Sequence, residues 1–147
     1  MYIGTKLINA EPMTRADFEA KHGRSVGGDK HGEGYEVTYE GGYQAWSPKD
    51  VFDAAYRPIN AMTFGLAIEA LKMGKKVARA GWNGKGMFLY YVPAASYPAQ
   101  RNEYGTMLGV FGNDMVPYVA MKTAQDNVVL WLARQTDVLA EDWQVVE

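Results

Sequence analysis

The segment Arg79–Gly86 (RAGWNGKG) holds the residues of this chain whose types and spacing best suit chemistry. Its three glycines allow a close backbone approach to a ligand and expose backbone amides. Trp82 offers a stacking surface for a purine, and Asn83 offers both a donor and an acceptor for a base or ribose edge. Arg79 and Lys85 supply positive charge for phosphate. A hairpin turn beside a core tryptophan explains the same residues equally well, so both interpretations stand at this point.

The pattern is not a known phosphate-binding fingerprint, because no helix opens after its glycines, as Rossmann and P-loop motifs require. The chain is also poor in other catalytic groups. Its two histidines, His22 and His31, lie in or beside a glycine-rich loop with Asp29 and Glu33, but their spacing matches no recognised metal site. A solvated loop explains them, and we expect no metal and no cofactor. The three serines, none in a nucleophile-elbow pattern, are Ser25, Ser47 and Ser96.

Three acids near the carboxyl end, Asp137, Glu141 and Asp142, leave one catalytic alternative open. Asp137 is explained structurally, since acids favour the first turn of a helix. A pair of carboxylates could also act as general acid and base. A hydrolase of cyclic nucleotides therefore stays as an alternative, although we expect no catalytic residue.

Composition and charge limit the function further. The chain has 147 residues, no cysteine and a net charge of −2, which excludes disulfides and cysteine-ligated zinc and argues against a general nucleic-acid binder. The segment from residue 72 to residue 85, however, contains five basic residues and no acid, and the basic residues are Lys72, Lys75, Lys76, Arg79 and Lys85. That cluster suits a small anionic ligand or a solvated basic face. No signal peptide and no apolar run of membrane-spanning length are visible, so we expect a cytoplasmic protein.

The chain divides near Arg57-Pro58, because the proline disfavours helix at residue 57. Residues 1–57 are expected to form a small α+β module. Its elements are a strand over 3–8, a helix from Thr14 to His22, a loop over 23–34, a hairpin of strands 35–39 and 43–46, and a helix capped by Ser47.

Residues 58–147 are also expected to be α+β, with a small antiparallel sheet and short helices. Thr63 caps a helix that Gly74 ends. Strands over 75–82 and 85–92 are joined by a tight Asn83-Gly84 turn, and 93–115 form a long excursion. Strands over 118–122, 128–130 and 143–146 follow, with a helical turn over 136–140.

The strand Met87–Val92 (MFLYYV) is apolar on both faces. One face of a small antiparallel sheet normally meets water. We therefore expect a helix to cover one face and another subunit to cover the other, which predicts a homo-oligomer.

Several motifs occur in the order found in a known family. They are Met62–Leu71 (MTFGLAIEAL), Gly74–Arg79, Gly81–Met87 (GWNGKGM), Pro117–Ala124, Trp131–Ala133 and Gln135–Trp143. Over about residues 62–147 the chain resembles the Thoeris anti-defence two family of phage and prophage proteins. The amino-terminal segment Gly42–Phe52 resembles a small module common in phage proteins, to which no activity attaches.

This resemblance implies a sponge rather than an enzyme, acting in the infected bacterial host cytoplasm. Family members bind cyclic ADP-ribose isomers such as glycocyclic ADP-ribose, and some also bind cyclic dinucleotides, without cleaving them. They are tetramers with ligand pockets between subunits. By analogy, Trp82 stacks on adenine, Asn83 hydrogen-bonds nearby, and Thr136 and Asp137 meet ribose hydroxyls or the base. Charge alone adds Arg79, Lys85 and Lys122 as phosphate ligands.

Two departures from the family pattern lie near the expected pocket. Family members commonly read VPWLASQTD, where this chain has Val129–Asp137 (VLWLARQTD). Leu130 and Arg134 are the departing residues, and Arg134 could alter which ligand fits. The main alternative to sequestration is a phage protein-interaction or structural module, which the aromatic-rich composition and the amino-terminal block would also suit.

Overall fold

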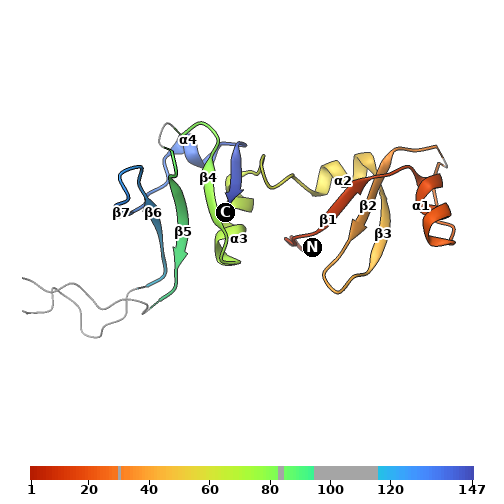
Figure 1. Cartoon of the computed structure of the whole chain (residues 1–147), viewed down its shortest axis with the longest axis horizontal. Coiled ribbons are helices and arrows are strands. Elements are labelled where there is room, and N and C mark those ends of the chain that lie inside the picture. Colours follow the sequence, from red (N-terminus) through yellow and green to blue (C-terminus); the bar gives the residue numbers. More distant parts are fainter. Residues whose placement is uncertain (30, 83–84, 95–115) are drawn as a thin grey trace, which may run out of the picture. The chain divides into compact units, whose positions relative to one another are not determined.

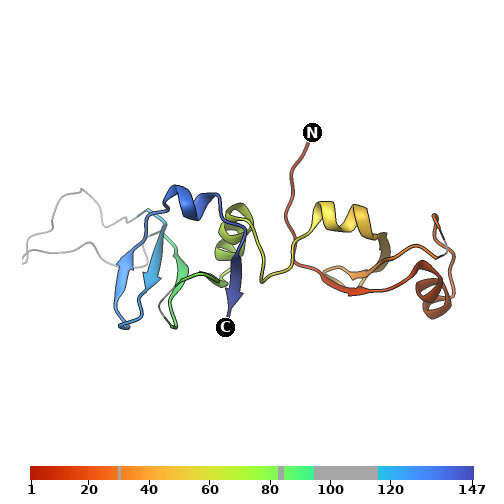
Figure 2. The same cartoon turned by 90° about the horizontal axis from the view of Figure 1, so that it is seen from above.

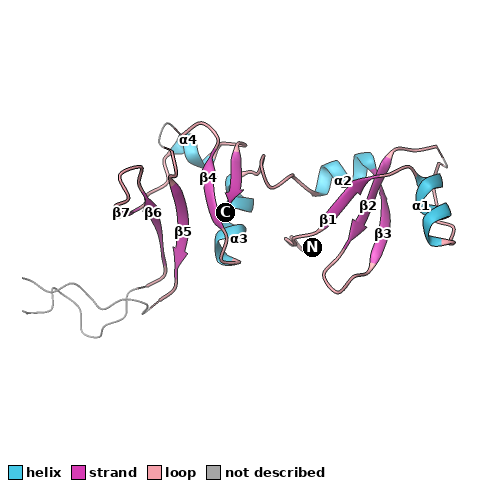
Figure 3. Ribbon diagram, viewed as in Figure 1, coloured by secondary structure: helices cyan, strands magenta, loops and turns pink. Residues whose placement is uncertain are grey.

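The computed structural model describes residues 1–29, 31–82, 85–94 and 116–147 (Figure 1). The chain forms two compact units, Met1–Arg57 and Pro58–Glu147. Both combine antiparallel sheet with short helices, so the α+β class predicted from the sequence is confirmed (Figure 3). No helix within the described ranges is long and apolar enough to cross a membrane.

The first unit has a three-stranded sheet in the order β1-β2-β3. Its elements are β1 (Asn9–Pro12), α1 (Arg15–His22), β2 (Gly34–Thr38), β3 (Gln44–Pro48) and α2 (Lys49–Ala55). Phe18 of α1 and Val37 of β2 are fully buried at its centre. As predicted, Thr14 caps α1 by accepting a hydrogen bond from the Asp17 amide, and the helix ends at His22. Gly23, with a φ of 65°, forms its C-cap.

Two sequence predictions for this unit are wrong. The first strand comprises Asn9–Pro12, not residues 3–8, because it is residues 9–12 that pair with β2. Pro12 is tolerated there because it lies at the end of an edge strand, where a missing N–H costs nothing. Ser47 does not cap α2: β3 continues through Pro48, and the Ser47 hydroxyl donates to the Pro48 carbonyl instead.

The second unit has a five-stranded antiparallel sheet in the order β7-β6-β5-β4-β8. Its elements are α3 (Phe64–Lys72), β4 (Lys76–Arg79), β5 (Phe88–Val92), β6 (Tyr118–Lys122), β7 (Val128–Leu130), α4 (Gln135–Val138) and β8 (Trp143–Val146). The Thr63 cap and the left-handed Gly74 after α3 confirm the predicted ends of that helix.

The strands β4 and β5 are shorter than predicted. After Arg79 the chain turns out of the β4–β5 pairing, because the Ala80 amide bonds to the Asp142 carbonyl and the Trp82 amide to the Arg79 carbonyl. The predicted Asn83-Gly84 turn and most of the predicted 93–115 excursion lie outside the described residues.

The core of this unit lies between α3 and one face of the sheet. Leu71 of α3, Val77, Leu89 and Trp143 are almost completely buried there. Figure 2 shows α3 and α4 on the same side of the sheet. In the part of the chain that the structure describes, no helix packs on the opposite face, which we call the open face.

Candidate functional site

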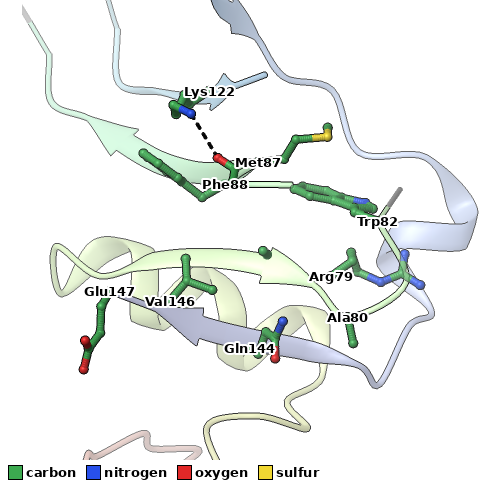
Figure 4. Close-up of a pocket in the computed structure, with 11 residues that line it drawn as sticks. Arg79, Ala80, Trp82, Met87, Phe88, Lys122, Gln144, Val146 and Glu147 are labelled. Carbon is green, nitrogen blue, oxygen red and sulfur yellow. Dashed lines mark hydrogen bonds between the residues drawn. The ribbon is translucent and has the colours of Figure 1, made fainter. Parts of the chain in front are cut away.

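A cleft of about 420 Å³ lies on the open face of the five-stranded sheet (Figure 4). Clefts of 300–1,000 Å³ are the usual size for small-molecule sites. Its lining comes from β4, the β4–β5 connection, β5, β6 and β8, and comprises Ala78, Arg79, Ala80, Trp82, Gly86, Met87, Phe88, Lys122, Gln144, Val146 and Glu147.

The floor of the cleft is one row of residues across four neighbouring strands. Phe88 is paired with Lys122, and Ala78 with Gln144. Since β4 and β5 run antiparallel with Val77 opposite Leu89, Ala78 lies next to Phe88. The row therefore reads Lys122, Phe88, Ala78, Gln144. The small alanine at its middle leaves the hollow between larger side chains.

Trp82 lies at the end of the cleft near the start of β5 (Figure 4). Its ring meets Trp143 edge-on, with 5.7 Å between centroids and an interplanar angle of 77°. Trp82 is half-buried and packs against the hydrophobic core while it also lines the cleft. The two interpretations of this residue, stacking surface and core residue, are therefore not exclusive.

Arg79 is held by two carboxylates. Its Nε donates to Asp142 Oδ1, and its Nη1 donates to Asp137 Oδ1 at 3.0 Å and to the Thr136 carbonyl at 3.2 Å. The guanidinium also lies 5.6 Å from the centre of the Trp143 ring. The Asp142 hydrogen bond raises the pKa of Arg79 and lowers that of Asp142. The cation is thus engaged in the fold as well as lining the cleft.

Asp137 is buried, and each of its carboxylate oxygens accepts a hydrogen bond. Oδ1 accepts from Arg79, and Oδ2 accepts from the Arg134 amide at 3.0 Å, which closes the first turn of α4. The Trp143 indole donates to the Asp137 carbonyl at 3.0 Å. Asp137 therefore ties α4 to β4 and β8. Thr136 is exposed beside it, and neither residue lines the cleft.

The ammonium groups of two lysines lie close to the ring of Phe88, and one of these lysines, Lys122, lines the cleft. Lys76 Nζ lies 5.1 Å and Lys122 Nζ 5.9 Å from the centre of the Phe88 ring. Lys122 also donates to the Gly86 carbonyl at 3.2 Å and pairs with Asp126 at 2.5 Å. Among the described residues, Lys76 has no carboxylate partner. Lys85 is exposed and is not part of the lining.

Comparison with known proteins shows which family contains the part of the chain that forms this cleft. The model of the Thoeris anti-defense 2-like domain matches residues 62–146. A protein of Bacillus phage SP01 named "Thoeris anti-defense 2" is 44% identical over 87 residues, which is 58% of this chain and 94% of that protein. The chain belongs to the Thoeris anti-defense 2-like family. The resemblance stated from the sequence motifs is confirmed.

The family match covers almost the whole cleft. Every lining residue except Glu147 falls within the Thoeris anti-defense 2-like domain, whereas residues 1–61 lie outside the match. The anti-defense family name thus attaches to the second unit. The role of the first unit as a phage-type module stays a prediction.

The structure brings the residues predicted to bind ligand into two groups. Trp82, Arg79 and Lys122 line the cleft. Arg79 joins them to Thr136 and Asp137, at the start of α4. Asn83 lies outside the described residues. Of the departing residues, Leu130 is exposed on β7 and Arg134 precedes α4.

Sequence reasoning missed Gln144 and Phe88 as residues of the cleft. Alternation in β8 could have found Gln144, because a residue next to the buried Trp143 must point to the opposite face. The same alternation in β5 separates Phe88 from the buried Leu89. Alternation alone places these side chains opposite the core, but only the structure shows that this face carries a cleft.

One histidine is engaged rather than solvated, contrary to the sequence prediction. His22 Nε2 lies 2.6 Å from Glu36 Oε2, and Lys21 Nζ lies 2.8 Å from Glu36 Oε1. These partners lower the pKa of the buried Glu36. Within the described residues no group of three metal-ligating side chains comes together.

Proposed function

We propose that this chain is a phage anti-defence protein that binds cyclic nucleotide immune signals and holds them without cleaving them. Glycocyclic ADP-ribose is the ligand class we favour, with cyclic dinucleotides as a second. The family of the second unit supports the anti-defence role. The arrangement of the cleft supports the nucleotide ligand.

The observation that carries the proposal is the placement of an indole ring and an ammonium group in one cleft, with a second ammonium group close to the Phe88 ring that lines it. Trp82 supplies a stacking surface for adenine at one end. Lys122 and Lys76, on either side of Phe88, supply positive charge for the phosphates. The exposed Lys85 would add charge from the β4–β5 connection. An aromatic surface with nearby cations matches the two halves of an adenine nucleotide.

Asn83, Thr136 and Asp137 retain the roles that the family resemblance gave them. Asn83 would hydrogen-bond near the adenine, and Thr136 would meet a ribose hydroxyl. Asp137 would act mainly by fixing Thr136 and Arg79, since its own carboxylate oxygens already accept hydrogen bonds.

The carboxylates of the site are better suited to structure than to hydrolysis. Asp137 and Asp142 share one guanidinium, and the lowered pKa of Asp142 keeps it ionised. A general acid needs the opposite, a carboxyl whose pKa is raised toward neutrality. This favours sequestration over the alternative of a cyclic-nucleotide hydrolase.

We also propose that the protein is a homotetramer, with ligand held between subunits. The open face presents Phe88, Val146 and the exposed Leu130. Burial of such a face against another copy would close the cleft from water and strengthen its electrostatic contacts. Sedimentation velocity should give a mass four times that of one chain.

Isothermal titration calorimetry tests the binding step. We expect heat of binding and saturation with glycocyclic ADP-ribose, and weaker or no binding of linear ADP-ribose. A protein-interaction module would give no heat with any member of a panel of cyclic nucleotides. That result would contradict the proposal.

A further inference from the structure

Gln144 is a polar residue of the cleft to which the proposed function gives no role. It lies in the middle of β8 and is half-buried, with its side chain on the open face. Among the described residues its carboxamide makes no hydrogen bond, although it lines the cleft. A half-buried amide with free donor and acceptor can still bind a ligand.

The position of Gln144 relative to the other lining residues is fixed by backbone pairing. It is opposite Ala78 on β4, and the small alanine leaves the space beside it open. Trp82 and Gln144 lie on opposite sides of β4, and both face the cleft (Figure 4). Lys122, at the other end of the floor row, lies three strands away, about 14 Å at the usual strand spacing.

Because Lys122 and Gln144 are this far apart, the two ends of the cleft suit different parts of a ligand. Lys122 lies on β6, and Lys76 reaches from β4 to within 5.1 Å of the centre of the Phe88 ring on β5, so negative charge is favoured beside Phe88. Gln144 is uncharged and lies on the β8 side. A neutral group with a hydrogen-bonding edge therefore suits the Gln144 end of the cleft, and a phosphate suits the lysine end.

We propose that Gln144 determines base specificity by hydrogen-bonding the edge of an adenine whose face stacks on Trp82. This rests on the proposed function. The carboxamide oxygen would accept from the exocyclic N6 amine, and the carboxamide nitrogen would donate to N7. This is the bidentate pairing by which glutamine and asparagine recognise adenine. Trp82 alone stacks on any base, so the choice of base needs such a group.

The test compares two ligands that differ in one group. One is glycocyclic ADP-ribose, and the other is its hypoxanthine counterpart, in which a carbonyl oxygen replaces the N6 amine. The wild-type protein should prefer adenine, because the glutamine oxygen then meets a donor rather than another acceptor. A good bidentate pair gives about 5- to 150-fold discrimination.

Gln144→Ala should bind the two ligands with nearly equal affinity, because the variant keeps stacking and charge but lacks the amide. Gln144→Glu should also weaken adenine binding, since a carboxylate cannot donate to N7. The matched control is Gln125→Ala, at an exposed turn residue, which should keep the wild-type preference. Melting curves confirm that each variant is folded.

The outcomes separate this inference from the function on which it rests. If the wild-type protein binds neither ligand, the proposed function fails and the role of Gln144 fails with it. If the wild type binds both equally, or Gln144→Ala keeps the full adenine preference, Gln144 does not select the base, while sequestration still stands.

Discussion

At the scale of single residues, Trp82 has two roles that a substitution can separate. The indole packs edge-on against Trp143 and also lines the cleft. Trp82→Ala should weaken nucleotide binding by about 1–3 kcal/mol, the usual range for base–aromatic stacking. It should also lower stability, by less than the 3–5 kcal/mol typical of a fully buried Trp. Calorimetry and urea unfolding measure the two effects.

Trp82→Phe provides the control, because a smaller ring still stacks on a base. It should recover most of the affinity while it leaves a gap beside Trp143. A Trp82→Ala protein with full affinity for the nucleotide would refute the stacking role.

The ionisation of Asp142 should make the free energy of unfolding depend on pH. Its pKa is lowered in the folded protein, chiefly by the hydrogen bond from Arg79. The stabilisation is therefore fully present above the unfolded-state pKa of about 3.9 and is lost as the pH falls through the lower folded-state value. Asp142→Asn should be destabilised at pH 7 by about 1–2 kcal/mol, the low end for a charged hydrogen bond because the side chain is partly exposed.

The difference in stability between wild type and Asp142→Asn should begin to narrow below about pH 4, where the carboxyl of the unfolded wild-type chain takes up a proton. It should disappear once the pH lies below the lower folded-state pKa, where the folded protein is protonated as well. Urea unfolding of both proteins at several pH values measures this difference in the free energy of unfolding. A difference that stays constant down to pH 2 would show that the Arg79 ion pair is not its source.

At the scale of elements, Gly34 sets the contact between β2 and β3. A Cβ at this position would lie 2.3 Å from the Ser47 carbonyl oxygen and 2.6 Å from the Trp46 ring. Gly34→Ala should therefore destabilise the first unit by about 1–3 kcal/mol or more, the usual cost of overpacking. Gly27→Ala, where a Cβ meets nothing within 4 Å, is the control and should be near neutral. Equal stability of the two variants by thermal unfolding would contradict this contact.

The elements that could be predicted from sequence are those with strong local signals. The caps Thr14 and Thr63 located the starts of α1 and α3, and Gly74 located the end of α3. The ranges 118–122, 128–130 and 143–146 were predicted as β6, β7 and β8 with the bounds that the structure shows. In these segments local preference and tertiary pairing agree.

The sequence predictions that are wrong or incomplete concern residues whose structure depends on long-range contacts. Residues 9–12 contain Asn and Pro, which disfavour a strand, but pairing with β2 outweighs that preference. Long-range pairing also explains why only part of the candidate site could be predicted from the sequence. Trp82 and Lys122 were found by residue type, whereas Gln144 enters the cleft only because β8 pairs with β4. The Arg79 contacts join residues about 60 positions apart, and no sequence spacing indicates them.

At the scale of the whole molecule, the two units have separate cores, and the family match is confined to the second. The cleft is built entirely from residues of that second unit. The proposed function of the protein therefore depends on what this cleft does with a nucleotide. A sponge must bind its ligand and return it unchanged, whereas an enzyme returns a product.

The most direct test is the fate of the ligand. The protein is incubated in molar excess with glycocyclic ADP-ribose, free ligand is removed by filtration, and the protein is then heat-denatured. We expect depletion of ligand from the filtrate and recovery of intact glycocyclic ADP-ribose after denaturation, both measured by liquid chromatography and mass spectrometry. Trp82→Ala run in parallel should deplete less ligand. Recovery of a cleaved product would contradict sequestration, and an undepleted filtrate would contradict binding itself.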